Sequence, residues 1–209
     1  MARYGAAKMT KSNQSLGGRL PLLDPTISTS AQRDLYEQLK SSWVAYASEL
    51  GFQAMTSDGR LIGPFNAFLL HPEVTAKLWE LQAAEAAQTT LPPRVREVVI
   101  IVVGAVWGAG YELYAQVQVG RKVGLSDDAI TTLANGGIPD VLSEQEKIAA
   151  RLALELSSRH RVDELYREAE QAFGRTALFD IVAVMGVYQT VCSALALFEV
   201  PAPSTTSAG

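Results

Sequence analysis

Three polar side chains have the types and spacing that proton transfer requires. Glu97 follows the start of one predicted helix, and Glu112 and Gln116 stand four residues apart on the next. A spacing of four places two side chains on the same face of a helix. Because the surrounding residues are strongly apolar, both carboxylates are expected to be buried, where a carboxylate must be paired, protonated or used. Glu97, Glu112 and Gln116 are therefore the catalytic candidates.

Five neighbouring residues are candidates for substrate binding. Arg94 or Arg96 can anchor a carboxylate with two parallel hydrogen bonds, and Tyr111 can orient a carbonyl group. Trp107 can form a pocket wall, and His71 can supply a titratable imidazole if the fold brings it near Glu112. Each has a structural alternative as well: a paired or solvated arginine, a core aromatic residue, or a histidine at the start of a helix.

The elements that position these residues are predicted to be helices. Pro92 and Pro93 suit a first helical turn, and Gly124 suits the end of a helix. Polar capping residues, apolar residues at helical spacing and Gly or Pro stops predict the remaining elements. The expected helices cover 29–50, a short segment after Gly63-Pro64, 72–88, 92–106, 109–123, 126–135, 143–160, 162–173 and 176–198, and Phe52–Leu61 is expected to be a loop.

Composition predicts a single globular domain. The chain has 209 residues, of which 48% are apolar, and we expect one domain over 21–202 with disordered tails at 1–20, which is basic, and 203–209. A net charge of −4 does not favour nucleic acid or an anionic membrane as a partner. The stretch Val98–Trp107 is too short to span a membrane, so we expect a cytoplasmic protein.

Cysteine and histidine content narrows the chemistry. Cys192 is the sole cysteine, so an internal disulfide or a thiol pair is excluded, and its apolar neighbours predict a small buried side chain. His160 falls at a predicted helix end, where a cation is favoured. Two histidines without metal-ligand spacing predict no metal site, and the sequence predicts no cofactor.

The segment LPPRVREVVIIVVGAVWGAGYELYAQVQVGRKVGLSDDAI resembles the carboxymuconolactone decarboxylase family, which also contains the alkylhydroperoxidase D-like proteins. The segments GPFNAFLLHPEV, SEQEKIAARLALELSSRHRV and MGVYQTVCSALALFEVPAP extend the resemblance to about residues 20–202. It implies an all-α alkylhydroperoxidase D-like domain that assembles as trimers or hexamers. It also implies a lyase of aromatic catabolism with a site on the second helix of the pair.

The family has a peroxidase branch and a thiol-free branch, and comparison with both indicates which residues would form the site. The peroxidase branch carries C-x-x-C and then a histidine where this chain has Ala109, Glu112 and Gln116, so both thiols are absent. The thiol-free branch carries Tyr-Glu-Trp and then a histidine, where this chain has Tyr111, Glu112, Leu113 and Gln116. Glu97 matches the family's usual glutamate. Gln116 can bind a substrate but cannot transfer a proton near pH 7.

Three functions remain open from the sequence. The first is a cofactor-free lyase that acts on a small carboxylated or lactone-like substrate, with Glu112 as the acid and Glu97 tuning it. The second is a helical ligand-binding or assembly protein made catalytically silent by Gln116. The third is a residual oxidoreductase that uses Cys192. A raised pKa on Glu112 in an enclosed pocket favours the first, ion-paired glutamates favour the second, and a reactive Cys192 favours the third.

Overall fold

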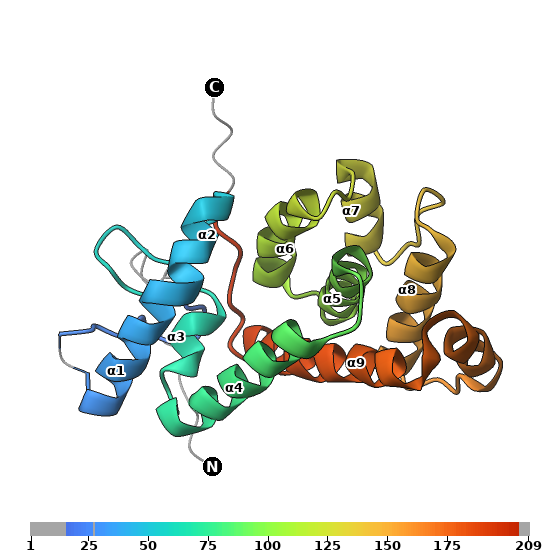
Figure 1. Ribbon diagram of the computed structural model, residues 1–209. Coiled ribbons are helices and arrows are strands. Elements are labelled where there is room, and N and C mark those ends of the chain that lie inside the picture. The colour runs from blue at the N-terminus through green and yellow to red at the C-terminus, as the bar shows by residue number, and fades with distance from the viewer. Residues whose placement is uncertain (1–15, 27, 205–209) are drawn as a thin grey trace, which may run out of the picture.

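The computed structural model describes residues 16–26 and 28–204, and these are almost wholly helical (Figure 1). Their one extended pairing is an isolated bridge between Met55 and Leu61, inside the predicted loop. The helices are α1 (Ser30–Leu39), η2 (Lys40–Val44), α2 (Ala45–Leu50), α3 (Pro64–Phe68), α4 (Pro72–Gln88), α5 (Pro93–Trp107), α6 (Gly110–Lys122), α7 (Asp127–Ala134), α8 (Glu144–Ser157) and α9 (Asp163–Leu197). The predicted all-α fold is thereby confirmed.

Capping residues fix where several helices begin. Thr29 caps α1: its hydroxyl accepts from the Gln32 N–H at 3.3 Å, and the Gln32 side chain accepts from the Thr29 N–H at 3.0 Å. Ser143 and Glu146 form the same reciprocal box at the start of α8. Each box satisfies two backbone N–H groups that a helix start leaves free. These starts fall where the sequence predicted them.

The first predicted helix is interrupted by a π-helical segment. Between α1 and α2, the five residues of η2 follow a wider turn, and the Ser42 hydroxyl donates to the carbonyl of Gln38 at 2.5 Å. A π segment inserts extra backbone per turn and so changes which side chains face inward. Apolar spacing predicts one regular helix over 29–50 with Trp43 and Tyr46 on its inward stripe, whereas both line a cavity.

Helix α5 is the centre of the molecule. It packs against α6, α7, α8 and α9, and Figure 1 shows it enclosed by them. Its residues 97–104 are all buried, which explains why the sequence there is apolar on every face rather than on one stripe. Glu97 is the sole acid in this buried run, so the fold carries a carboxyl group into its core.

Helix α9 crosses beneath the other helices. The sequence predicted two helices with a stop at Gly174, and Gly174 is indeed non-helical, with φ 73° and ψ 167°. The helix is long and apolar enough to cross a membrane by length and composition alone. The sequence-based prediction in this respect rested only on the shorter stretch Val98–Trp107. Such a helix is also typical of a soluble core, and α9 packs against α4, α5 and α8.

The predicted tails lie largely outside the described residues. Residues 1–15 and 205–209 are not described, so the prediction of disorder there stays a prediction. Residues 16–20 were assigned to the basic tail, yet they contact the end of α9. The Arg19 N–H donates to the carbonyl of Phe198 at 2.6 Å, and its guanidinium pairs with Glu199.

Candidate active site

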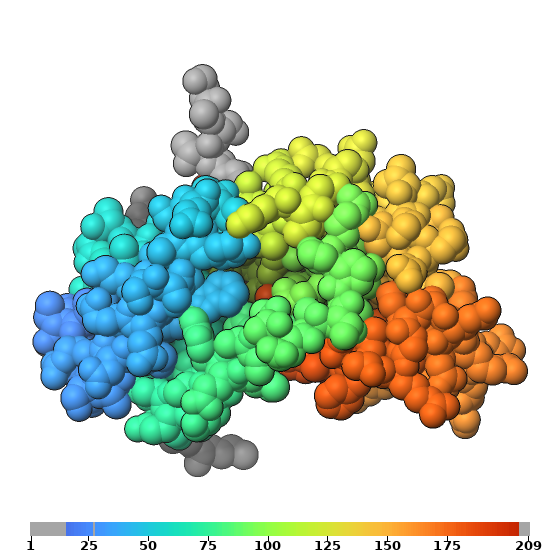
Figure 2. Space-filling model, viewed as in Figure 1, coloured from blue at the N-terminus to red at the C-terminus, as the bar shows by residue number. Residues whose placement is uncertain are grey.

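One large cavity lies between the N-terminal helices and the central helices α5 and α6. Its volume is about 460 Å³, within the usual range for small-molecule sites. Side chains from η2, α2, α3, α4, α5, α6 and α9 line it. Figure 2 shows the molecule hollowed between the blue segment α1–α2 and the green segment α4. Segments far apart in the sequence therefore share one chamber.

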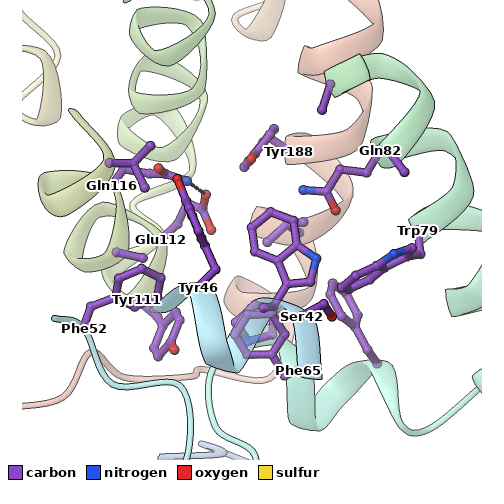
Figure 3. A pocket seen from close by; sticks show the side chains of 18 of the residues that line it. Ser42, Tyr46, Phe52, Phe65, Trp79, Gln82, Tyr111, Glu112, Gln116 and Tyr188 are labelled. Carbon is purple, nitrogen blue, oxygen red and sulfur yellow. Dashed lines mark hydrogen bonds between the residues drawn. The ribbon is translucent and has the colours of Figure 1, made fainter. Parts of the chain in front are cut away.

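Aromatic side chains form most of the wall. Trp43 packs edge-to-face against Trp79 and Tyr46, with ring centroids 5.6 and 5.9 Å away. Edge-to-face pairs of this kind hold rings in fixed orientations. The aromatic residues that line the cavity are Trp43, Tyr46, Phe52, Phe65, Phe68, Trp79, Tyr111 and Tyr188. The chamber thus suits a small flat ligand, and Figure 3 shows several of these rings turned toward it.

Two carboxyl groups lie at the buried end of the cavity. Glu97 and Glu112 are 2% and 4% exposed, and neither has an ion-pair partner among the described residues. Burial, and then the charge of Glu112, raise the pKa of Glu97 to about 8, although Arg96 opposes this. Burial raises the pKa of Glu112 to about 7, and a hydrogen bond from Gln116 opposes it. The pair therefore exchanges protons near neutral pH.

Gln116 contacts one member of the carboxyl pair, Glu112, directly. Its Nε2 donates to Oε1 of Glu112 at 2.6 Å, one helical turn away, as the dashed line in Figure 3 shows. This bond fixes the amide so that the Gln116 Oε1 atom is buried without a partner. The Oε1 atom of Glu97 is buried without a partner as well. Both residues line the cavity, and buried polar atoms are normally satisfied, so each atom calls for a donor that the described residues do not supply.

Arg96 lines the cavity but is already engaged. Its guanidinium holds Glu85 of α4 with Nε–Oε1 and Nη2–Oε2 distances of 2.9 and 2.5 Å. The guanidinium carbon lies 5.8 Å from the centre of the Tyr188 ring, within cation–π range. Because Glu85 neutralises it in a bidentate pair, Arg96 does not offer the free cation that the sequence predicted as a carboxylate anchor.

Tyr111 forms a wall but points its hydroxyl away from the carboxyl pair. That hydroxyl donates to the backbone carbonyl of Gln53 at 2.7 Å. The ring lies so close to Gly63 that a Cβ there would meet it at 2.3 Å, and Gly63 has a positive φ of 64°. Glycine is therefore required at this position. The predicted role of Tyr111 in orienting a carbonyl requires correction to a wall contact.

Three predicted binding residues lie outside the cavity. Arg94 turns toward α8, where its Nε donates to Glu146 at 2.6 Å. His71 is exposed beside Glu73 at 3.3 Å, and Trp107 is 41% exposed at the end of α5. Residues 94 and 96 are about 200° apart around a helix, so the two arginines face different neighbours. The substrate-binding roles predicted for Arg94, His71 and Trp107 are corrected accordingly.

Most of the wall was not predicted from the sequence as part of a site. Trp79 and Gln82 of α4 reach the cavity because α4 packs against α9, and Ser42 of η2 reaches it because the adjoining helix α2 packs against α6. Tyr188 of α9, which stands at helical spacing among apolar residues, also forms part of the wall. Amphipathic spacing marked Trp43 and Tyr46 as inward-facing, but spacing alone does not separate core from cavity.

Metal and thiol chemistry find no site in the described residues. No three His, Cys, Asp or Glu side chains cluster there in a way that could hold a metal ion. Cys192 is fully buried in α9, and burial, together with the charge of Glu112, raises the pKa of its thiol. A reactive cysteine needs an exposed thiol with a lowered pKa. The predicted structural role of Cys192 fits this environment.

Comparison with known proteins supports the same scaffold. Residues 72–156 match the sequence model of the carboxymuconolactone decarboxylase family, which confirms the resemblance over α4 to α8. No curated protein matches the chain. Among solved structures, a cysteine-to-alanine variant of the debrominase Bmp8, in complex with 2,3,4-tribromopyrrole, superimposes with a TM-score of 0.64. The identity is 16%, over 85% of this chain and 94% of that chain, so the likeness shows the fold alone.

Proposed function

We propose that the protein is a cofactor-free enzyme of the lyase type, in which Glu97 and Glu112 move protons to and from a small substrate. The carrying observation is the pair of buried carboxyl groups without ion partners at the end of an aromatic cavity. A merely structural glutamate in such a place would be paired, as Glu85 and Glu146 are. The family segment and a fold shared with a debrominase support an enzyme on this scaffold.

The raised pKa values of Glu97 and Glu112 keep a proton on the carboxyl pair near neutral pH. Burial disfavours ionisation of both groups, and the charge of Glu112 further disfavours ionisation of Glu97, so the pair holds a proton that it can deliver to a substrate. The sequence assigned the acid role to Glu112 and a tuning role to Glu97, and that assignment stays a prediction. In a lyase step, a bond to the departing group breaks and the electron pair stays on the substrate. One carboxyl group of the pair then delivers its proton to that atom, becomes a carboxylate and is reprotonated from solvent.

The alternative of a catalytically silent ligand-binding or assembly protein is less well supported. It predicts that both glutamates are ion-paired in a closed site, whereas neither is paired and the cavity is open to one face (Figure 2). The residual oxidoreductase alternative requires a reactive Cys192, which is buried. Aromatic catabolism and a cytoplasmic location stay predictions. Assembly into trimers or hexamers does too; size-exclusion chromatography with light scattering would test it.

Decarboxylation of carboxymuconolactone is the reaction to test first, because the family is named for it. Purified protein would be followed by loss of substrate absorbance, beside Glu112→Gln and Gln116→His. Glu164→Gln, an exposed glutamate at the start of α9, is the matched control. A panel of small lactones and cyclic acids and bases would follow. Turnover lost in Glu112→Gln and kept in Glu164→Gln supports the proposal. Turnover unchanged in Glu112→Gln contradicts it.

A further inference from the structure

The charges around the cavity disfavour an anionic ligand. Among the lining residues, Arg96 is the one cation, and Glu85 holds it with N–O distances of 2.5 to 3.1 Å. The acids Glu97 and Glu112 have no such partner. A buried carboxylate needs a cation or several N–H donors. An anionic substrate would find no free cation in the lining and would face two further carboxyl groups.

The unpartnered atoms specify what a ligand must offer. Oε1 of Gln116 is a carbonyl oxygen and can only accept a hydrogen bond, because its amide nitrogen already donates to Glu112. Oε1 of Glu97 has no partner either, and it accepts whenever the carboxyl group is ionised. Both side chains are more than nine-tenths buried. A ligand that satisfies both therefore presents at least two donor groups.

The walls favour a flat cation over a neutral donor. Trp43, Tyr46, Trp79 and Tyr188 line the chamber with ring faces and edges, and Tyr188 already attracts the guanidinium of Arg96. The negative faces of aromatic rings attract cations, most strongly where water is excluded. Flat rings also stack against such walls at little cost in conformational freedom. Cation, donors and flat shape combine in protonated nitrogen bases.

We infer that the cavity takes a small flat nitrogen base, an amidine or amino-heterocycle, which enters as its cation and donates N–H groups to Glu97 and Gln116. The inference rests on the proposed function, since it names the substrate class of the same site. It also replaces the carboxylated substrate expected from the sequence with one of opposite charge.

Three probes of nearly equal shape test the charge directly. Benzamidine, benzamide and benzoate share a flat ring and differ in carrying a cation, a neutral amide or an anion. Titration calorimetry at pH 7.5 would measure their affinities for the full chain. We expect benzamidine to bind at least tenfold more tightly than benzoate, with benzamide between them. Benzoate binding as tightly as benzamidine, or no binding by any probe, would overturn the inference.

Two variants test the contacts. Glu97→Gln and Gln116→Leu should each weaken benzamidine binding by about tenfold or more, whereas Glu164→Gln should leave it unchanged. Unchanged benzamidine affinity in both cavity variants, with circular dichroism confirming their fold, would overturn the inference. Binding needs no turnover, so the two claims fail separately. A protein that prefers benzamidine but turns over nothing retains the inference, and one that prefers benzoate and decarboxylates through Glu112 retains the function.

Discussion

Buried glutamates occur in two settings in this molecule. Glu85 and Glu146 each pair with an arginine from the first turn of α5, whereas Glu97 and Glu112 at the end of the cavity have no cation. All four are buried to a similar degree, so burial does not distinguish them. What differs is the partner, and the partner decides whether a buried acid holds the fold together or stays available for chemistry.

The paired acids join helices. Arg96 ties α5 to α4 through Glu85, and Arg94 ties α5 to α8 through Glu146. Burial alone would raise the pKa of Glu146, but hydrogen bonds from Arg94 and the Ser143 backbone outweigh it and lower the pKa. Glu146 therefore stays ionised at neutral pH. The unpaired acids have raised pKa values and exchange protons there.

The largest expected effect is on turnover. Glu97→Gln and Glu112→Gln should each reduce kcat at least about 100-fold on any substrate that the wild type converts, because each removes a proton-transfer group. Glu146→Gln, which alters a paired acid, should keep kcat within about threefold once its fold is verified. Steady-state kinetics would decide. Equal losses in the paired and unpaired variants would break the distinction between the two settings.

The next largest effect is on the free energy of unfolding, and it concerns the paired acids. Glu85→Ala should lower the free energy of unfolding by about 3 kcal/mol, because it leaves the largely buried Arg96 without its carboxylate. Urea unfolding followed by circular dichroism would measure it. Glu97→Gln should cost much less at pH 8, because it removes a carboxyl group that has no cation. A larger loss in Glu97→Gln than in Glu85→Ala would reverse the comparison.

The unpaired acids also predict how stability depends on pH. A carboxyl group with a raised pKa binds more protons in the folded than in the unfolded state between about pH 4.5 and its folded value. Stability from Glu97 and Glu112 is therefore full below pH 4.5 and is lost as the pH rises toward 8. The expected slope is up to about 1.4 kcal/mol per pH unit for each group. Unfolding at several pH values would show a smaller slope in Glu97→Gln.

The smallest effect concerns the one hydrogen bond that the pair receives. Gln116→Leu removes the donor to Glu112 and should raise the pKa of Glu112 further, by up to about one unit, since a neutral hydrogen bond contributes about 1 kcal/mol. Carbon-13 titration of labelled glutamate would detect the change. Glu164→Gln serves as the control, and a lowered pKa in Gln116→Leu would contradict the assignment.

The sequence predicted the helices well because their signals are local. The capping box at Ser143 and the break at Gly174 each depend on a few adjacent residues and fall as predicted, and Thr29 is the cap where the sequence left Thr29 and Ser30 open. The π-helical segment was missed because Ser42 and its neighbours carry no pattern that separates it from a regular helix. Local sequence patterns therefore predict where helices begin and end, but not irregular segments within them.

The site was only partly predictable because it depends on packing. Helical spacing placed Glu112 and Gln116 together, and the structure brings Glu97 to the same cavity. Spacing could not tell Arg94 from Arg96, because their partners lie on other helices, Glu146 on α8 and Glu85 on α4. The aromatic wall combines side chains from η2, α2, α3, α4, α6 and α9 and from the loop before α3, so no single window of the sequence contains it.

The titration of Glu97 and Glu112 in the wild-type protein tests the distinction most directly. Carbon-13 NMR of labelled glutamate, assigned with Glu97→Gln and Glu112→Gln, would follow both carboxyl groups from pH 4 to pH 10. We predict two groups that titrate near pH 7 and 8, well above the ordinary glutamate value of 4.5. Titration of both groups below pH 5 would show that they are stabilised as anions, and the proposed proton transfer would lose its basis.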